Sequence, residues 1–102
     1  MKNPIQIQFV KIAVSESLTD YITNKLDVLF RKYPQLIKAQ VYIKKETENR
    51  DKECVCEIEL SLPGPRLFAS SKEYNFEVSV KHTISELEHQ LQKGKAKLLA
   101  TH

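Results

Sequence analysis

Four short stretches of the chain alternate apolar and polar residues, which is the pattern of a half-buried β-strand. They run from residue 5 to 9, 39 to 45, 54 to 62 and 66 to 71. In the third stretch one face is apolar and consists of Cys54, Cys56, Ile58, Leu60 and Leu62. A register shift of one residue would expose that whole row, so we expect a well-fixed register.

Two longer stretches place apolar residues at helical spacing. Ser15 and Ser17 are candidate N-caps for the first helix, and Pro34 ends it. Its apolar stripe consists of Leu18, Tyr21, Ile22, Leu26, Leu29, Phe30 and Tyr33. The second helix is expected from residue 76 to 98, with a stripe of Phe76, Val80, Ile84, Leu87, Leu91 and Leu98. Each stripe gives its helix one face that can pack on a core.

The order of these elements predicts the fold class. The polar segment 46–52 has the composition of a hairpin loop, and residues 63–65 (Pro-Gly-Pro) that of a turn. The order is therefore β-α-β-β-β-α, which predicts an α+β fold. We expect a two-layer sandwich with both helices on one face of a four-stranded, mainly antiparallel sheet. No repeat or linker is visible, so residues 1–102 are expected to form a single domain.

Composition places the chain among ordinary globular proteins. Of its 102 residues 41% are hydrophobic and 28% charged. No apolar run approaches the roughly 20 residues that span a bilayer, and the amino terminus resembles no signal peptide. We therefore expect a cytoplasmic protein that does not bind membranes. The net charge is only +3, and segment 81–102 is the most basic part of the chain.

The two cysteines do not indicate a disulfide or a metal site. Cys54 and Cys56 are one residue apart on a predicted strand, where a disulfide would be strained. They could suggest a metal together with His82 or His89, but no paired motif with further ligands at fixed spacing is present. We expect two reduced thiols packed in the core as small apolar groups.

The sequence also gives no sign of catalysis. With only two glycines it has no glycine-rich phosphate loop, and its serine, histidine and acidic residues follow no recognisable catalytic spacing. We expect no enzymatic activity, no cofactor and no small-molecule substrate. A small domain that ends in a lysine-rich amphipathic helix is more typical of a protein that binds an acidic partner.

Several strings, in their order along the chain, resemble the ribosome hibernation-promoting factor family, also known as ribosome-associated inhibitor or protein Y. They include Ser15-Glu16-Ser17-Leu18 after the first strand, and Lys25 in the first helix. Residues 57–64 (Glu-Ile-Glu-Leu-Ser-Leu-Pro-Gly) and 67–69 (Leu-Phe-Ala) follow. Residues 87–98 (Leu-Glu-His-Gln-Leu-Gln-Lys-Gly-Lys-Ala-Lys-Leu) match the end of the family pattern. The resemblance covers nearly the whole chain.

The resemblance implies a fold similar to a double-stranded-RNA-binding domain with an extra amino-terminal strand. It implies binding to rRNA of the small ribosomal subunit, in the channel that holds mRNA and tRNA. Translation would then be inhibited in stationary phase or stress, and hibernating ribosomes would be favoured. At 102 residues the chain resembles a short form, without the family's further carboxyl-terminal domain, and we expect the isolated protein to be a monomer.

Neutralisation of phosphates by basic side chains would give this binding its affinity. The candidate rRNA-binding residues are Lys25, Lys93, Lys95, Lys97, Lys81, His89, Arg66 and Lys72. The simpler interpretation is that these side chains only form solvated helix faces or complement a helix dipole. The family usually has an acidic residue at the position of Lys81 and arginine at that of His89.

A second hypothesis is a diverged paralogue that acts as a protein-interaction or regulatory module. Its interface would be the sheet face turned away from the helices. Tyr42, Val55 and Phe68 would lie there beside Glu57 and Glu59. Binding through phosphates should weaken steeply with salt, whereas such a protein contact should not.

Overall fold

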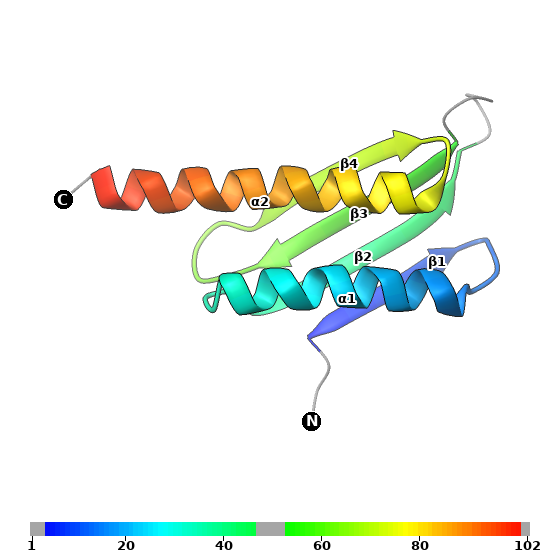
Figure 1. Ribbon diagram of the computed structural model, residues 1–102, viewed down its shortest axis with the longest axis horizontal. Helices are drawn as coiled ribbons and strands as arrows, with labels where there is room; N and C mark the ends of the chain where they lie inside the picture. Colours follow the sequence, from blue (N-terminus) through cyan, green and yellow to red (C-terminus); the bar gives the residue numbers. More distant parts are fainter. Residues whose placement is uncertain (1–3, 47–52, 101–102) are drawn as a thin grey trace.

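The computed structural model describes residues 4–46 and 53–100, with side chains described up to Lys93 (Figure 1). The elements are β1 (Ile5–Val10), α1 (Glu16–Lys32), β2 (Lys38–Lys45), β3 (Cys54–Ser61), β4 (Leu67–Glu73) and α2 (Phe76–Ala100). This is the predicted β-α-β-β-β-α order. The observed bounds differ from the expected ones by at most two residues at each end.

The strands form one mixed sheet in the order β1-β2-β3-β4. β1 is parallel to β2, with α1 as the crossover between them, whereas the other two neighbouring pairs are antiparallel. Both helices lie on the same face of the sheet (Figure 1). The predicted two-layer α+β fold with a mainly antiparallel sheet is confirmed.

The register separates an apolar inner face from a polar outer face, as the alternation predicts. Rows of paired residues on the inner face are Ile5-Ala39-Leu60-Leu67 and Ile7-Val41-Ile58-Ala69. Rows on the outer face are Gln6-Gln40-Glu59-Phe68, Gln8-Tyr42-Glu57-Ser70 and Val10-Lys44-Val55-Lys72. The helices therefore cover the apolar rows, and the outer face carries mostly polar and charged side chains together with Val10, Tyr42, Val55 and Phe68.

The apolar stripes of the helices close the core. Buried residues of the stripes are Leu18, Ile22, Leu26, Leu29, Tyr33, Val80, Ile84, Leu87 and Leu91. Phe76 packs partly buried against them, while the side chain of Leu98 lies outside the described part. Fully burying an aliphatic side chain contributes about 1.5–3 kcal/mol. The packing of the helix stripes against the apolar face of the sheet is therefore the main source of stability.

Two buried polar residues on α2 were not part of the predicted stripe. The Ser79 hydroxyl donates to the carbonyl oxygen of Ser71 at 2.7 Å. The Thr83 hydroxyl approaches the carbonyl oxygens of Ser79 at 2.8 Å and of Cys56 at 3.3 Å. Both hydroxyls are therefore satisfied, and they connect α2 to β3 and β4 at positions where the helix packs closely on the sheet.

The predicted connections are also consistent with the structure. Gly64 has φ 106°, a conformation that favours glycine, in the turn between β3 and β4. The amide of Glu46 donates to the carbonyl oxygen of Glu53 at 2.8 Å and closes the β2–β3 hairpin. Of the predicted loop, residues 46–52, only Glu46 belongs to the described residues, and residues 47–52 lie outside them.

The two helices run side by side in the same direction, so their carboxyl ends lie at the same end of the molecule (Figure 1). α2 is the longer helix, with 25 residues against 17 in α1. Its last turns extend beyond the end of the sheet (Figure 1). This arrangement determines which charged residues of the two helices come together.

Candidate nucleic-acid interface

An ion pair joins the two helices near the end of α1. The Lys32 ammonium in the last turn of α1 donates to a carboxylate oxygen of Glu88 in α2 at 2.9 Å. This hydrogen bond, followed by the charge of Glu88, raises the pKa of Lys32. The pair therefore identifies Lys32 as lying on the side of α1 that faces α2, and Glu88 as lying on the side of α2 that faces α1.

Lys25 and Lys81 lie at one level of this helical layer. Lys25 is seven residues, about two turns, before Lys32 in α1, and Lys81 is seven residues before Glu88 in α2. Both side chains are exposed, and the Lys25 ammonium lies 5.5 Å from the ring centroid of Tyr21. Two candidate residues that are far apart in sequence are thus brought onto the same surface.

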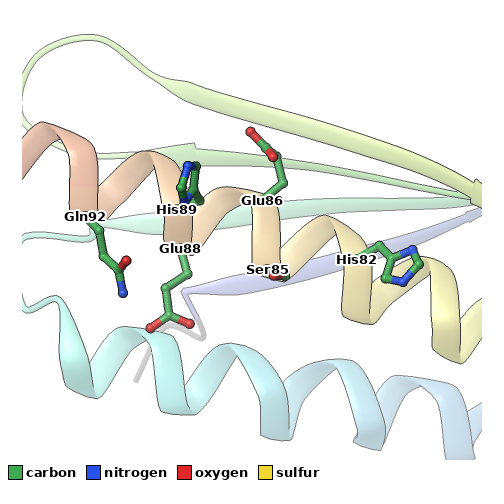
Figure 2. Close-up of a pocket in the computed structure, with 6 residues that line it drawn as sticks. All are labelled: His82, Ser85, Glu86, Glu88, His89 and Gln92. Atoms are coloured by element: carbon green, nitrogen blue, oxygen red, sulfur yellow. The ribbon is translucent and has the colours of Figure 1, made fainter.

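His89 and Lys93 are exposed on α2, four residues apart. His89 borders a shallow hollow along α2 that is lined by His82, Ser85, Glu86, Glu88, His89 and Gln92. Figure 2 shows Glu88 and Gln92 pointing toward α1, whereas His89 and Glu86 point to the other side of α2. Carboxylates in this hollow oppose phosphate binding, so it is not itself an anion site.

Lys95 and Lys97 belong to the projecting part of α2, but their side chains lie outside the described part. The sequence alone places them two and four residues beyond Lys93, toward the free end of the helix. Their helix therefore extends the basic segment away from the sheet.

Arg66 and Lys72 lie at opposite ends of β4. Arg66 directly precedes the strand and pairs with Glu59 at 3.6 Å. Lys72, near the end of the strand, pairs with Glu46 at 2.8 Å on the outer face. Only Arg66 is at the end of the molecule where the helices finish, so the structure does not bring Lys72 together with the cluster.

Basic residues from several elements lie at the end of the molecule where the helices finish, which we call the basic pole. Its described members are Arg31, Lys32, Lys38, Arg66 and Lys93. They come from the end of α1, the start of β2, the turn before β4 and the last part of α2 (Figure 1). Arg31, Lys32 and Lys38 are not among the residues predicted from the sequence, although a count of charges at the ends of the predicted elements indicates them.

The opposite end of the molecule carries mixed charge. Lys44 pairs with Glu57 at 3.1 Å, and Lys45 pairs with Glu53 at 3.6 Å. The His82 ring also contacts Glu73 there, at 2.9 Å. Among the described residues, Lys44 and Lys45 are therefore paired with carboxylates, as Lys32 and Arg66 are at the basic pole, whereas Arg31 and Lys38 are not.

The outer sheet face differs from the surface that the second hypothesis requires. Phe68 is 55% exposed there, but Val55 is only 2% exposed between Lys44 and Lys72 in the register. The aliphatic stems of lysines can cover such a small side chain. Glu57 and Glu59 both form ion pairs across the sheet. Of its two aromatic side chains, Phe68 is exposed and Tyr42 is partly buried, and both of the carboxylates that the hypothesis names are paired.

The predicted burial of both cysteines is confirmed. Burial raises the pKa of the Cys56 thiol to about 12 and also raises the pKa of Cys54. Within residues 4–46 and 53–100, no three histidine, cysteine or acidic side chains are grouped so that they could hold a metal ion. None of the helices described is both long and apolar enough to cross a membrane.

Comparisons with known proteins agree with this fold. A ribosomal subunit interface protein from Coxiella burnetii superposes with a TM-score of 0.79 at 22% identity, covering 90% of this chain and 97% of that one. The amino-terminal domain of Protein Y from Thermus thermophilus superposes with a TM-score of 0.73 at 21% identity, covering 91% and 98%. At these identities the likeness establishes the fold alone. No curated protein matches the sequence.

The family is established by the sequence itself. The profile of the family described as Sigma 54 modulation protein / S30EA ribosomal protein matches residues 5–99. That range runs from the first residue of β1 almost to the end of α2. The chain therefore belongs to the Sigma 54 modulation protein / S30EA ribosomal protein family.

Proposed function

We propose that this protein is a non-enzymatic, cytoplasmic translation inhibitor that binds the small ribosomal subunit. It contacts rRNA in the channel that holds mRNA and tRNA, and it favours hibernating ribosomes in stationary phase or stress. The observation that carries the proposal is the basic pole, because it concentrates cations at one end of a member of a ribosomal protein family. The protein acts as a monomer without a cofactor.

The mechanism is occupancy rather than chemistry. Lysine and arginine side chains displace the counterions of rRNA phosphates, which gives affinity without reading sequence. Two parallel helices present such charges in a fixed arrangement, so that the shape of folded RNA selects the site. Lys25, Lys93, Lys95, Lys97, Lys81, His89 and Arg66 are the proposed contacts. Lys72 is the weakest of the candidate residues, because of its distant position and its ion pair with Glu46.

Co-sedimentation with vacant small subunits tests the proposal. The protein should pellet with small subunits at low salt and be released at high salt, since phosphate contacts weaken steeply with ionic strength. The variant K93Q/K95Q/K97Q should lose this pelleting. The variant K11Q/K44Q/K45Q removes the same charge from the opposite end of the molecule and should retain it.

Inhibition of translation is tested in the same preparations. Wild-type protein and the K11Q/K44Q/K45Q control should inhibit a purified translation system, and K93Q/K95Q/K97Q should not. Absence of wild-type pelleting at low salt would overturn the proposal. Salt-insensitive binding that both variants retain would instead favour the protein-interaction hypothesis and the outer sheet face.

A further inference from the structure

We infer that the RNA-contacting surface is centred on the basic pole, and that Arg31 and Lys38 bind phosphates there together with Lys93. This inference rests on the proposed function and specifies the part of the molecule that approaches the RNA. Neither Arg31 nor Lys38 belongs to the lysine-rich end of α2. They join it only because the fold brings the end of α1 and the start of β2 to the same end of the molecule as the last part of α2 (Figure 1).

The link between α1 and β2 fixes these two residues relative to the sheet. The amide of Leu36 donates to the carbonyl oxygen of Tyr33 at 3.0 Å, and that of Ile37 donates to Ser61 at 2.8 Å. Tyr33 and Leu36 are buried, so the short link is held by packing as well as by hydrogen bonds. Lys38 is thereby placed opposite Ser61, at the end of β3. Its neighbour Ala39 belongs to the buried inner face, so the alternation of the strand puts Lys38 on the outer face. The pole therefore extends from the ends of the helices around the end of the sheet.

Charge at the pole is available for a partner. Within the described part of the chain, Arg31 and Lys38 are both exposed and neither forms an ion pair with a carboxylate. Their neighbours Lys32 and Arg66 are held by Glu88 and Glu59, at 2.9 and 3.6 Å. The two free side chains can therefore approach a phosphate without first breaking a contact within the protein.

A purely structural role accounts for only one of the two residues. Arg31 lies in the last turn of α1, where a cation stabilises the negative end of the helix dipole. Lys38 begins a strand and has no such role. Because the carboxyl ends of both helices point to the pole, their partial negative charge would repel phosphate. Binding there requires cations in excess of those that complement the helices.

Nucleic acid is the partner whose chemistry fits this surface. The guanidinium of Arg31 can bind one phosphate through two parallel hydrogen bonds, and lysines can add single contacts to neighbouring phosphates. The cations come from four separate segments and spread over an end of the molecule, which suits the backbone of folded RNA.

The test compares R31Q/K38Q with K11Q/K45Q, which removes the same charge from the opposite end. Binding of each protein is measured against salt with two probes, vacant small ribosomal subunits and a fluorescent RNA hairpin. Circular dichroism and thermal unfolding verify that each variant is folded. From the salt dependence of phosphate binding, each lost cation–phosphate contact should weaken binding on the order of tenfold at 0.1 M salt, so R31Q/K38Q should bind on the order of a hundredfold more weakly than the wild type. R31Q/K38Q should also bind with a shallower salt dependence, whereas K11Q/K45Q should bind like the wild type.

The outcomes separate the inference from the proposed function. If the wild type binds subunits and R31Q/K38Q binds them equally well, the inference is wrong and the proposed function stands. If the wild type ignores subunits but binds the hairpin through Arg31 and Lys38, the inference stands and the proposed function is wrong. Failure to bind either probe, or equally weakened binding in both variants, overturns the inference.

Discussion

Glu88 places a negative charge among the cations that we propose for RNA binding. It holds Lys32 at 2.9 Å and lies between the level of Lys25 and Lys81 and the basic segment that begins at Lys93. Its carboxylate neutralises one cation of the basic pole and repels an approaching phosphate. Glu88 therefore limits the affinity that the surface can reach.

The substitution Glu88→Gln tests this role. It keeps the size and a hydrogen-bonding oxygen of the side chain but removes its charge, which frees the charge of Lys32. Affinity for small subunits at 0.1 M salt should rise severalfold, with a steeper salt dependence. Glu77→Gln makes the same charge change in the first turn of α2, far from the pole, and should leave affinity nearly unchanged. Equal affinities of E88Q and the wild type would show that the pole does not face the RNA.

The buried thiol of Cys56 should make the free energy of unfolding decrease at alkaline pH. Burial raises its pKa to about 12 in the folded protein, compared with about 8.5 in an unfolded chain. Between these values the folded state binds more protons than the unfolded state, so stability falls as pH rises. Below pH 8.5 the contribution of this thiol is fully present.

Urea unfolding of the wild type and Cys56→Ala between pH 8 and 10.5 measures this effect. Above about pH 9 the wild type should lose stability faster than the variant, by up to about 1.4 kcal/mol per pH unit. Lysines and tyrosines titrate in both proteins, and their effects cancel in the difference. Parallel stability curves would mean that Cys56 ionises in the folded protein as it does in the unfolded chain.

At the scale of elements, α1 begins after one of the two serines that are candidate N-caps in the sequence. Ser15 is the N-cap, and its hydroxyl accepts a hydrogen bond from the amide of Leu18 at 3.2 Å. Ser17 is within the first turn, where its hydroxyl lies 3.2 Å from that of Ser15. Only Ser15 satisfies an otherwise unpaired amide of the helix.

Alanine substitutions of the two serines should therefore differ. Ser15→Ala should lower the free energy of unfolding by about 1 kcal/mol, the usual cost of losing an N-cap. Ser17→Ala removes a hydroxyl in the same turn and should change stability by only a few tenths of a kcal/mol. Urea unfolding followed by circular dichroism measures both. A larger loss for Ser17→Ala would place the functional cap at that residue.

At the scale of the whole molecule, parallel helices produce the basic pole. Their carboxyl ends point to the same end of the molecule, so the cations in the last part of each helix accumulate there (Figure 1). Among the described residues, cations without an ion pair are more numerous at the basic pole than at the other end, where Lys44, Lys45 and Lys72 face carboxylates, so the charge is polar along the length of the described part. Such polarity orients the protein as it approaches a strongly negative surface such as rRNA.

The sequence was sufficient for the fold because each local pattern agreed with the final packing. The row from Cys54 to Leu60 and the stripe from Leu18 to Leu29 are both buried as their periods predict. The burial of Val55, Ser79 and Thr83 was not predictable in this way. Each is buried by neighbours from other elements, and those neighbours are known only once the elements are assembled.

The candidate site could be predicted only in part for a similar reason. Lysines clustered in sequence, as from Lys93 onward, are visible in the sequence itself. Arg31 and Lys38 join them only through the direction of the helices and the order of the strands. Lys72 is a candidate because it is basic, but the structure places it at the other end of β4.

The central claim is that the protein occupies the decoding channel through its basic pole. Chemical footprinting of small-subunit rRNA, with and without saturating protein, tests it most directly. We predict protection of rRNA nucleotides along the path of mRNA and the tRNA anticodon arms, absent with K93Q/K95Q/K97Q and retained with K11Q/K44Q/K45Q. Protection confined to rRNA outside that channel, or no protection at low salt, would contradict the account.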